Sequence, residues 1–165
     1  MTSLKKINKN QFLALPFCED KGAKKNILKF YGTKERLTAI EMLPFVKTRE
    51  FRLNFLRPEL FDSNDIHSLV CEFVEHVLDV CGENKDELIH NIRLKKKWIN
   101  GQVSNAELRK QFLKSDIWLR RYVLSRFSES AYLVARMCRE FSPNPRLELA
   151  WQLNHMDKWV NNVNS

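Results

Sequence analysis

Glycine and proline are scarce in this sequence, since its 165 residues include only 4 Gly and 5 Pro. Folds with many strands and tight turns need more of both, so the composition favours helices. No apolar run approaches the length of a membrane span. The apolar stretch after the N-terminal lysines is too short for a secretory signal peptide and is interrupted by Pro16. We therefore expect a helical protein of the cytoplasm.

The motifs of common enzymes and metal sites are also missing. The glycines are too far apart to form a phosphate-binding loop, and no G-x-S-x-G nucleophile elbow is present. The four cysteines (Cys18, Cys71, Cys81 and Cys138) show no C-x-x-C spacing, so we interpret them as reduced residues rather than ligands. Glu72 and His76 lie one helical turn apart, but no third metal ligand accompanies them. We expect no enzymatic activity, no cofactor and no bound metal.

Charge is abundant and unevenly distributed, with a net charge of +8. Residues 1–60 and 84–126 are strongly basic, whereas residues 61–83 contain six Asp and Glu and no Lys or Arg. Such alternation along a chain predicts separate charged surfaces rather than one uniform field.

Apolar residues recur at helical spacing from residue 63 onward. The pattern and its capping residues predict helices over 63–81, 84–100 and 129–141, and a last helix from 145. A third segment opens at Ser104 and either continues to about residue 127 or breaks near Ser115. Phe127 and Phe141 belong to the expected apolar stripes.

The fold class expected from these patterns is all-α, in a single-domain bundle of five or more helices. The bundle occupies residues 63–165. A basic N-terminal region, residues 1–62, precedes it and contains short helices or an extended arm. Phe51, Leu53 and Phe55 alternate with polar residues, which is consistent with a short strand.

Three groups of side chains are candidates for binding a partner. The basic set is Arg93, Lys95, Lys96, Lys97, Arg109, Lys110, Arg120 and Arg121. The acidic set is Glu72, Glu75, His76 and Asp79. Trp118 and Trp159 lie off their helical stripes and are candidate aromatic anchors. Three interpretations of the basic set remain open. It forms the solvated side of amphipathic helices, it binds nucleic acid, or it contacts an acidic protein.

The stretches "WINGQVSNAEL" and "AWQLNHM" carry a resemblance to a known family. A helix ends at Gly101, Ser104 and Glu107 open the next helix, and Trp151-Gln152 lies on the terminal helix. With "CEFVEHVLDVCGENKDELIHNIR" before that turn, residues 63–160 resemble the all-helical immunity proteins of bacterial polymorphic-toxin systems, of the fifth immunity family type. The resemblance implies that Gly101, Ser104, Glu107, Trp151 and Gln152 define the fold.

The resemblance also implies a function. It implies a small non-enzymatic protein that binds a toxin and blocks it by steric occlusion, and a phage-borne inhibitor of a bacterial defence nuclease would look much the same from sequence. The acidic set suits a basic, nucleic-acid-cleaving target. The alternative that we keep is a basic accessory protein that binds nucleic acid.

Overall fold

The computed structural model describes residues 4–15, 21–116 and 118–163. Its N-terminal part contains α1 (Lys9–Leu13), α2 (Lys21–Phe30), α3 (Ala39–Met42), α4 (Arg49–Leu53) and the two-residue strands β1 (Ile7–Asn8) and β2 (Arg36–Leu37). Its C-terminal part contains α5 (Ser63–His76), α6 (Lys85–Ile99), α7 (Asn105–Lys114), α8 (Trp118–Tyr122), α9 (Ala131–Phe141) and α10 (Pro145–Val163). The expected all-α class with a short strand is confirmed.

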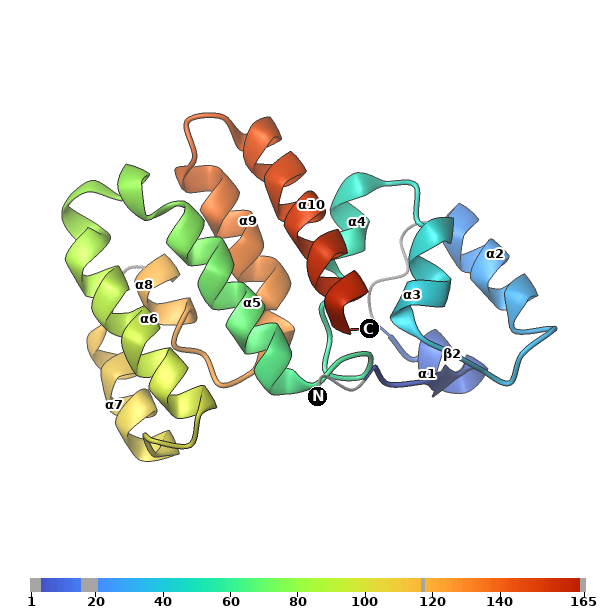
Figure 1. The fold of residues 1–165 in the computed structure, drawn as a ribbon, viewed down its shortest axis with the longest axis horizontal. Helices are drawn as coiled ribbons and strands as arrows, with labels where there is room; N and C mark the ends of the chain where they lie inside the picture. The colour runs from blue at the N-terminus through green and yellow to red at the C-terminus, as the bar shows by residue number, and fades with distance from the viewer. Residues whose placement is uncertain (1–3, 16–20, 117, 164–165) are drawn as a thin grey trace.

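The long helices lie side by side in one layer. Figure 1 shows α6, α5, α9 and α10 in that order across the molecule, and α5 packs against both α6 and α9. The helix α7 contacts α6 and α8, and α8 also contacts both α6 and α9, whereas α4 contacts α10 at the other end of the layer. Thus α7 and α2 lie at opposite ends of the long axis.

Side-chain caps explain where several of these helices begin. Capping boxes open α1 at Asn8, α3 at Thr38 and α7 at Ser104, where the Glu107 carboxylate accepts from the Ser104 amide. Asp62 caps α5 by accepting from the Asn64 amide. Gly101 ends the turn after α6 with φ +71°, a left-handed conformation that a residue with a Cβ adopts only with strain.

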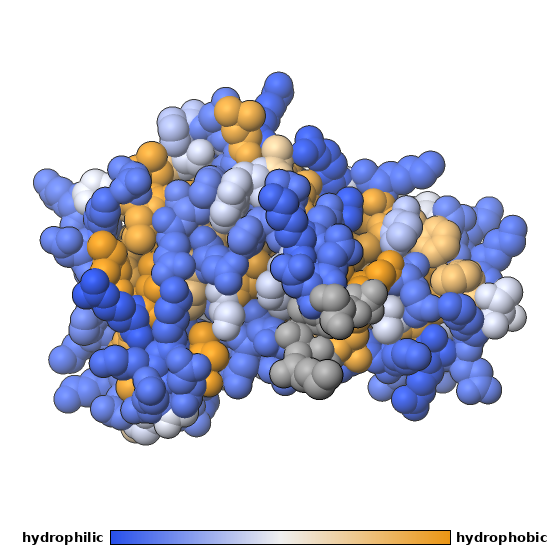
Figure 2. All heavy atoms as spheres, viewed as in Figure 1, coloured by the Kyte–Doolittle hydropathy of each residue, from blue (hydrophilic) through white to orange (hydrophobic). Residues whose placement is uncertain are grey.

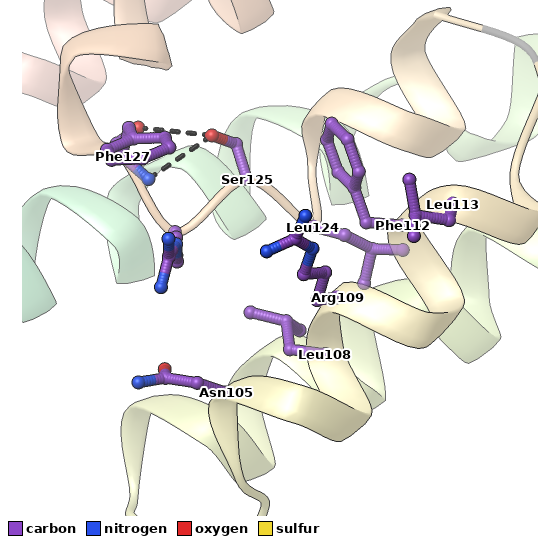
Figure 3. Close-up of a pocket in the computed structure, with 9 residues that line it drawn as sticks. Asn105, Leu108, Arg109, Phe112, Leu113, Leu124, Ser125 and Phe127 are labelled. Atoms are coloured by element: carbon purple, nitrogen blue, oxygen red, sulfur yellow. Dashed lines mark hydrogen bonds between the residues drawn. The ribbon is translucent and has the colours of Figure 1, made fainter.

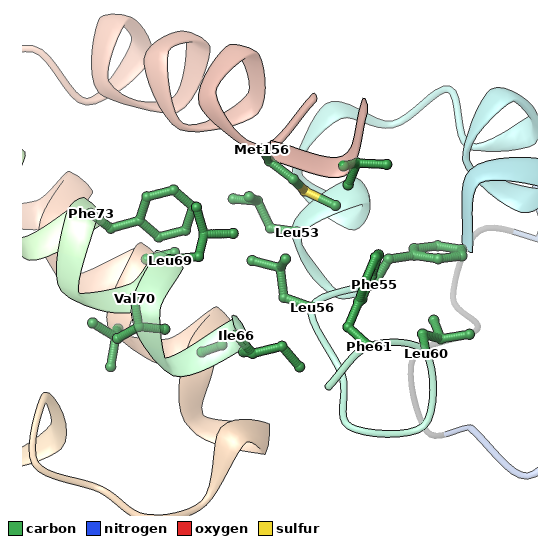
Figure 4. Packing of buried hydrophobic residues seen from close by; sticks show 14 of the residues in the cluster. Leu53, Phe55, Leu56, Leu60, Phe61, Ile66, Leu69, Val70, Phe73 and Met156 are labelled. Atoms are coloured by element: carbon green, nitrogen blue, oxygen red, sulfur yellow. The ribbon is translucent and has the colours of Figure 1, made fainter. Parts of the chain in front are cut away.

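One continuous apolar core connects the two parts of the chain. Leu53, Leu56 and Phe61 from the N-terminal part meet Phe73 and Met156 from the bundle, as Figure 4 shows. The visible surface is largely hydrophilic, with apolar residues in narrow strips between helices (Figure 2). The regions 1–62 and 63–165 therefore share a core rather than forming separate globules.

The structure corrects three local expectations. Residues 49–53 form the helix α4 rather than a strand, because Arg52 pairs with Asp157 of α10 (2.6 Å) and Leu53 packs into the core. Phe127 and Phe141 are exposed, to 60% and 36%. The segment that opens at Ser104 breaks between Lys114 and Trp118, which is one of the two alternatives expected from sequence, so Phe127 follows the end of α8 instead of extending a helix.

Candidate partner-binding groove

A groove of about 280 Å³ lies between α7 and the chain that follows α8 (Figure 3). Its lining residues are Asn105, Leu108, Arg109, Phe112, Leu113, Leu124, Ser125, Arg126 and Phe127. Leu113 and Phe127 are each 60% exposed, so apolar surface is presented to solvent on both sides of the groove. Neighbouring exposed apolar side chains of this kind are typical of interaction sites.

The groove also carries positive charge and no negative charge among its lining residues. The Arg126 guanidinium lies over the Phe127 ring, 5.2 Å from its centroid. The Arg121 guanidinium covers the ring of the lining residue Phe112 at 5.0 Å, and its Nε donates to the Phe112 carbonyl. A cation over an aromatic ring is attracted by the electrons of the ring. These contacts therefore stabilise the arrangement of the arginine and phenylalanine side chains, and the guanidinium groups keep their positive charge.

Two buried titratable side chains hold the 125–127 segment from behind. Lys95 of α6 is fully buried, and its Nζ donates to the Ser125 carbonyl oxygen. His67 of α5 is 3% exposed and hydrogen-bonds with the backbone of Arg126. One wall of the groove is therefore tethered to α5 and α6 through consecutive backbone groups.

Trp98 connects this anchor to the opposite wall. The Lys95 Nζ lies 4.3 Å from the Trp98 ring centroid, and the His67 ring meets Trp98 edge to face at 5.2 Å. The Trp98 Nε1 donates to Asn105 Oδ1 (2.8 Å), at the first residue of α7. Trp98 thus links both sides of the groove through its ring and its single donor.

Burial shifts the pKa of each titratable group in this anchor. Desolvation lowers the pKa of Lys95 to about 7. Desolvation, with a smaller contribution from the Lys95 charge, lowers the pKa of His67 to about 3. Burial also raises the pKa of the neighbouring Cys71 thiol to about 12. Neutral forms are favoured at all three positions, as expected where charge is costly.

The basic set does not form one solvated face. Contrary to the expectation of a surface position, Lys95 is 0% exposed, because it occupies the inner stripe of α6 between Ile92 and Ile99. Lys96 pairs with Glu75 (2.5 Å). Arg120 is partly buried and pairs with Glu87 and Asp116. Arg93, Lys97, Arg109 and Lys110 are exposed, and of these Arg109 lines the groove.

Each member of the acidic set has a partner within the molecule. Glu72 pairs with His155, and Glu75 with Lys96. His76 contacts Glu148 at 2.9 Å, and Asp79 contacts Lys85 at 2.6 Å. The pairs of Glu72 and His76 connect α5 to α10 and the pair of Glu75 connects α5 to α6, whereas Asp79 lies after α5 and is exposed.

The residues that the resemblance marks as fold-defining have structural contacts. The Trp151 ring is stacked between His76 (3.5 Å) and His155 (4.7 Å). Gln152 is buried and donates to the Ala135 carbonyl. Gly101, Ser104 and Glu107 form the turn and capping box already described.

The two candidate aromatic anchors differ in exposure. Trp118 is 66% exposed, at the start of α8, and remains available to a partner. Trp159 is partly buried and packs on Phe61 with ring centroids 5.0 Å apart. Trp118 therefore fits the anchor hypothesis better than Trp159 does.

Sequence reasoning missed Phe127 and Arg126 as groove residues and His67 and Lys95 as the anchor beneath them. A signal for Lys95 was present, because Leu88, Ile92 and Ile99 define a stripe on which position 95 falls. The possible break near Ser115 was the signal for Phe127, but its exposure also depends on where the chain leaves α8 after Tyr122.

Among the described residues, no cluster of three or more potential metal ligands occurs. The described helices also include none with the length and apolarity required to cross a membrane. Cys71, Cys81 and Cys138 are free thiols, whereas Cys18 lies outside the described residues. No protein family, curated protein or solved structure matches the chain.

Proposed function

We propose that this chain is a non-enzymatic binding protein that neutralises a protein target by steric occlusion, and that the groove between α7 and residues 125–127 is its contact surface. The observation that carries the proposal is the exposed apolar pair Leu113 and Phe127 beside Arg109 and Arg126. Aromatic and arginine side chains dominate the binding energy of protein interfaces.

The charge of the groove defines the chemistry of the target segment. A groove with two arginines and no acidic lining residue suits an acidic segment that carries an apolar or aromatic side chain. The tether from Lys95 and His67 reduces the freedom of the 125–127 wall before binding. Preorganisation of this kind lowers the entropic cost of association.

The resemblance of residues 63–160 to immunity proteins supports a toxin or nuclease as the target, and a cytoplasmic site of action. An immunity protein needs no catalytic group, because covering the target's working surface is sufficient. Such a protein depends on its affinity for the target and on a surface that is complementary in shape.

Capture from nuclease-treated host lysate tests the proposal with two matched variants. Phe127→Asp places a charge in the groove, and Phe141→Asp places the same charge at another exposed phenylalanine. We expect one stoichiometric protein to survive a high-salt wash with the wild type and Phe141→Asp. Loss of a central aromatic contact costs about 2 kcal/mol or more, so Phe127→Asp should weaken binding by at least about 30-fold.

The captured protein then provides the functional readout. Its toxic or nuclease activity should fall when the wild type is added in stoichiometric amount, and Phe127→Asp should fail to protect. Equal capture by both variants would reject the groove as the interface. Undiminished target activity in the complex would reject neutralisation.

A further inference from the structure

Helix α2 lies at the opposite end of the molecule from α7, which lines the groove (Figure 1), and it contains three regularly spaced lysines. Lys21, Lys25 and Lys29 recur every four residues and are all exposed. Four residues advance an α-helix by slightly more than one turn, so the three side chains lie along the same side of α2. With a rise of 1.5 Å per residue they extend over about 12 Å.

These lysines are not committed to internal pairs with described residues. None of the three forms an ion pair or hydrogen bond with an acidic side chain in the part of the chain that the structure describes. The surrounding N-terminal part reinforces the field, because residues 1–61 of the sequence include 13 Lys and Arg and 6 Asp and Glu. Among the residues that the structure describes, no acidic side chain neutralises the α2 lysine line formed by these three residues.

The opposite side of α2 fixes the helix to the core. Ala23 and Ile27 are buried, and Tyr31, just after the helix, donates its hydroxyl to the Ile7 carbonyl (3.0 Å). The Tyr31 ring also packs against Phe12 at 5.9 Å. The lysine line is thus displayed on a fixed support rather than on a free tail.

We propose that the α2 lysine line binds the sugar–phosphate backbone of a nucleic acid duplex. A duplex places about seven phosphate charges along 12 Å of its axis, enough to engage all three ammonium groups at once. No aromatic residue occurs between Lys21 and Lys29, and Phe30, which follows Lys29, is partly buried and packs against the Phe45 ring, so the line itself presents no fully exposed ring for stacking unpaired bases. Contact with phosphates alone specifies no base sequence.

An anionic membrane is a poorer match for the same helix. Interfacial helices insert an apolar face beneath their cations, whereas Ala23 and Ile27 of α2 already pack in the protein core. The site differs from the basic stretch at 93–97, where Lys95 is buried and Lys96 is paired. It is also independent of the groove, which lies at the other end of the molecule.

Fluorescence anisotropy with a short labelled DNA duplex and a short labelled RNA duplex, each over a series of salt concentrations, tests the proposal. The triple variant Lys21→Gln, Lys25→Gln, Lys29→Gln removes the line. The control removes the same charge elsewhere with Lys114→Gln, Arg146→Gln and Lys158→Gln, all exposed on α7 and α10. Thermal unfolding verifies that both variants are folded.

We expect the wild type and the control to bind at least one duplex, with an affinity that falls steeply as salt rises. The slope of log affinity against log salt should decrease by about 3 in the α2 variant, about one for each lost phosphate contact, and by less than about 1 in the control. Equal losses in both variants would reduce the effect to net charge and reject the site. The proposal is also rejected if neither duplex binds, or if vesicles of phosphatidylserine and phosphatidylcholine bind while the duplexes do not.

Discussion

Helices α2 and α6 both contain a cluster of lysines, and the structure uses them differently. In α6 the consecutive Lys95, Lys96 and Lys97 are respectively buried, paired with Glu75 and exposed. In α2 the lysines are spaced by a helical turn, so they share one exposed side. Consecutive positions on a helix point about 100° apart, whereas positions four apart nearly coincide. Spacing, rather than the number of lysines, decides which cluster forms a surface.

The largest expected effect is a difference in the free energy of unfolding between variants at two lysines of α6. Lys95→Glu would place a carboxylate against the Ser125 carbonyl oxygen in the core, with both groups acting as acceptors. We expect a loss of about 4 kcal/mol in the free energy of unfolding, since an unpaired buried charge is strongly destabilising. Lys97→Glu, at an exposed position, should change it by less than about 0.5 kcal/mol. Urea denaturation of both variants measures the difference.

Equal stability of the two variants would contradict the burial of Lys95. It would also remove the tether that we assign to the wall of the groove. The comparison uses the same chemical change two residues apart, so sequence context and net charge are matched.

The second effect concerns the other member of the anchor, His67. Its folded pKa of about 3 lies below the usual value of 6.5, so the unfolded state binds the proton more readily. Stability is therefore retained above pH 6.5 and is lost as the pH falls through the interval from 6.5 to 3. This group alone should remove about 3 kcal/mol between about pH 6.5 and about pH 4.

A His67→Phe variant isolates that contribution from the carboxylates that also titrate in acid. The difference between the two proteins in free energy of unfolding should change with pH over this interval and be flat above it. A parallel pH dependence in both proteins would show that His67 is accessible to protons in the folded state.

Much of the bundle follows from sequence because its signals are local. The Ser104–Glu107 capping box and the glycine at 101 are chemistry within one turn, and both occur as expected. Burial of Lys95 depends instead on Ser125, thirty residues later, whose carbonyl accepts its hydrogen bond. Local patterns do not specify such a partner.

Local sequence patterns could not predict the groove for the same reason. It exists because the chain leaves the helical path after Lys114 and again after Tyr122, which brings Phe127 opposite Leu113. A continuous helix through this segment satisfies the apolar periodicity equally well. Packing of α8 against α6 and α9 decides between the two.

A third and smaller effect is expected at alkaline pH and again depends on Lys95. Its folded pKa of about 7 lies below the usual 10.5, so protons are lost from the folded state first and stability rises with pH. We expect a gain of about 2 kcal/mol between about pH 7 and about pH 9 relative to Lys95→Met, which cannot titrate. Above about pH 9 the raised pKa of Cys71 acts in the opposite direction, in both proteins.

Chemical denaturation at several pH values across this alkaline interval measures the gain. Lys97→Met, where the lysine is exposed, provides the matched control and should follow the wild type. If Lys95→Met shows the same pH dependence as Lys97→Met, the ammonium of Lys95 is retained in the folded state.

The smallest expected effect concerns α2, where a single substitution should increase stability and remove duplex binding. Lysines four residues apart repel each other, so Lys25→Glu removes two repulsive pairs and allows the new carboxylate to attract Lys29, one turn toward the C-terminus, which is the favourable direction. We expect thermal unfolding to show a stabilisation of about 0.5 kcal/mol. The same variant should lose duplex binding, because it reverses the charge at the centre of the lysine line. A lysine line that contributes only solubility would instead tolerate Lys25→Glu without any change in nucleic acid affinity beyond that of Lys97→Glu, and that outcome would contradict the proposed site.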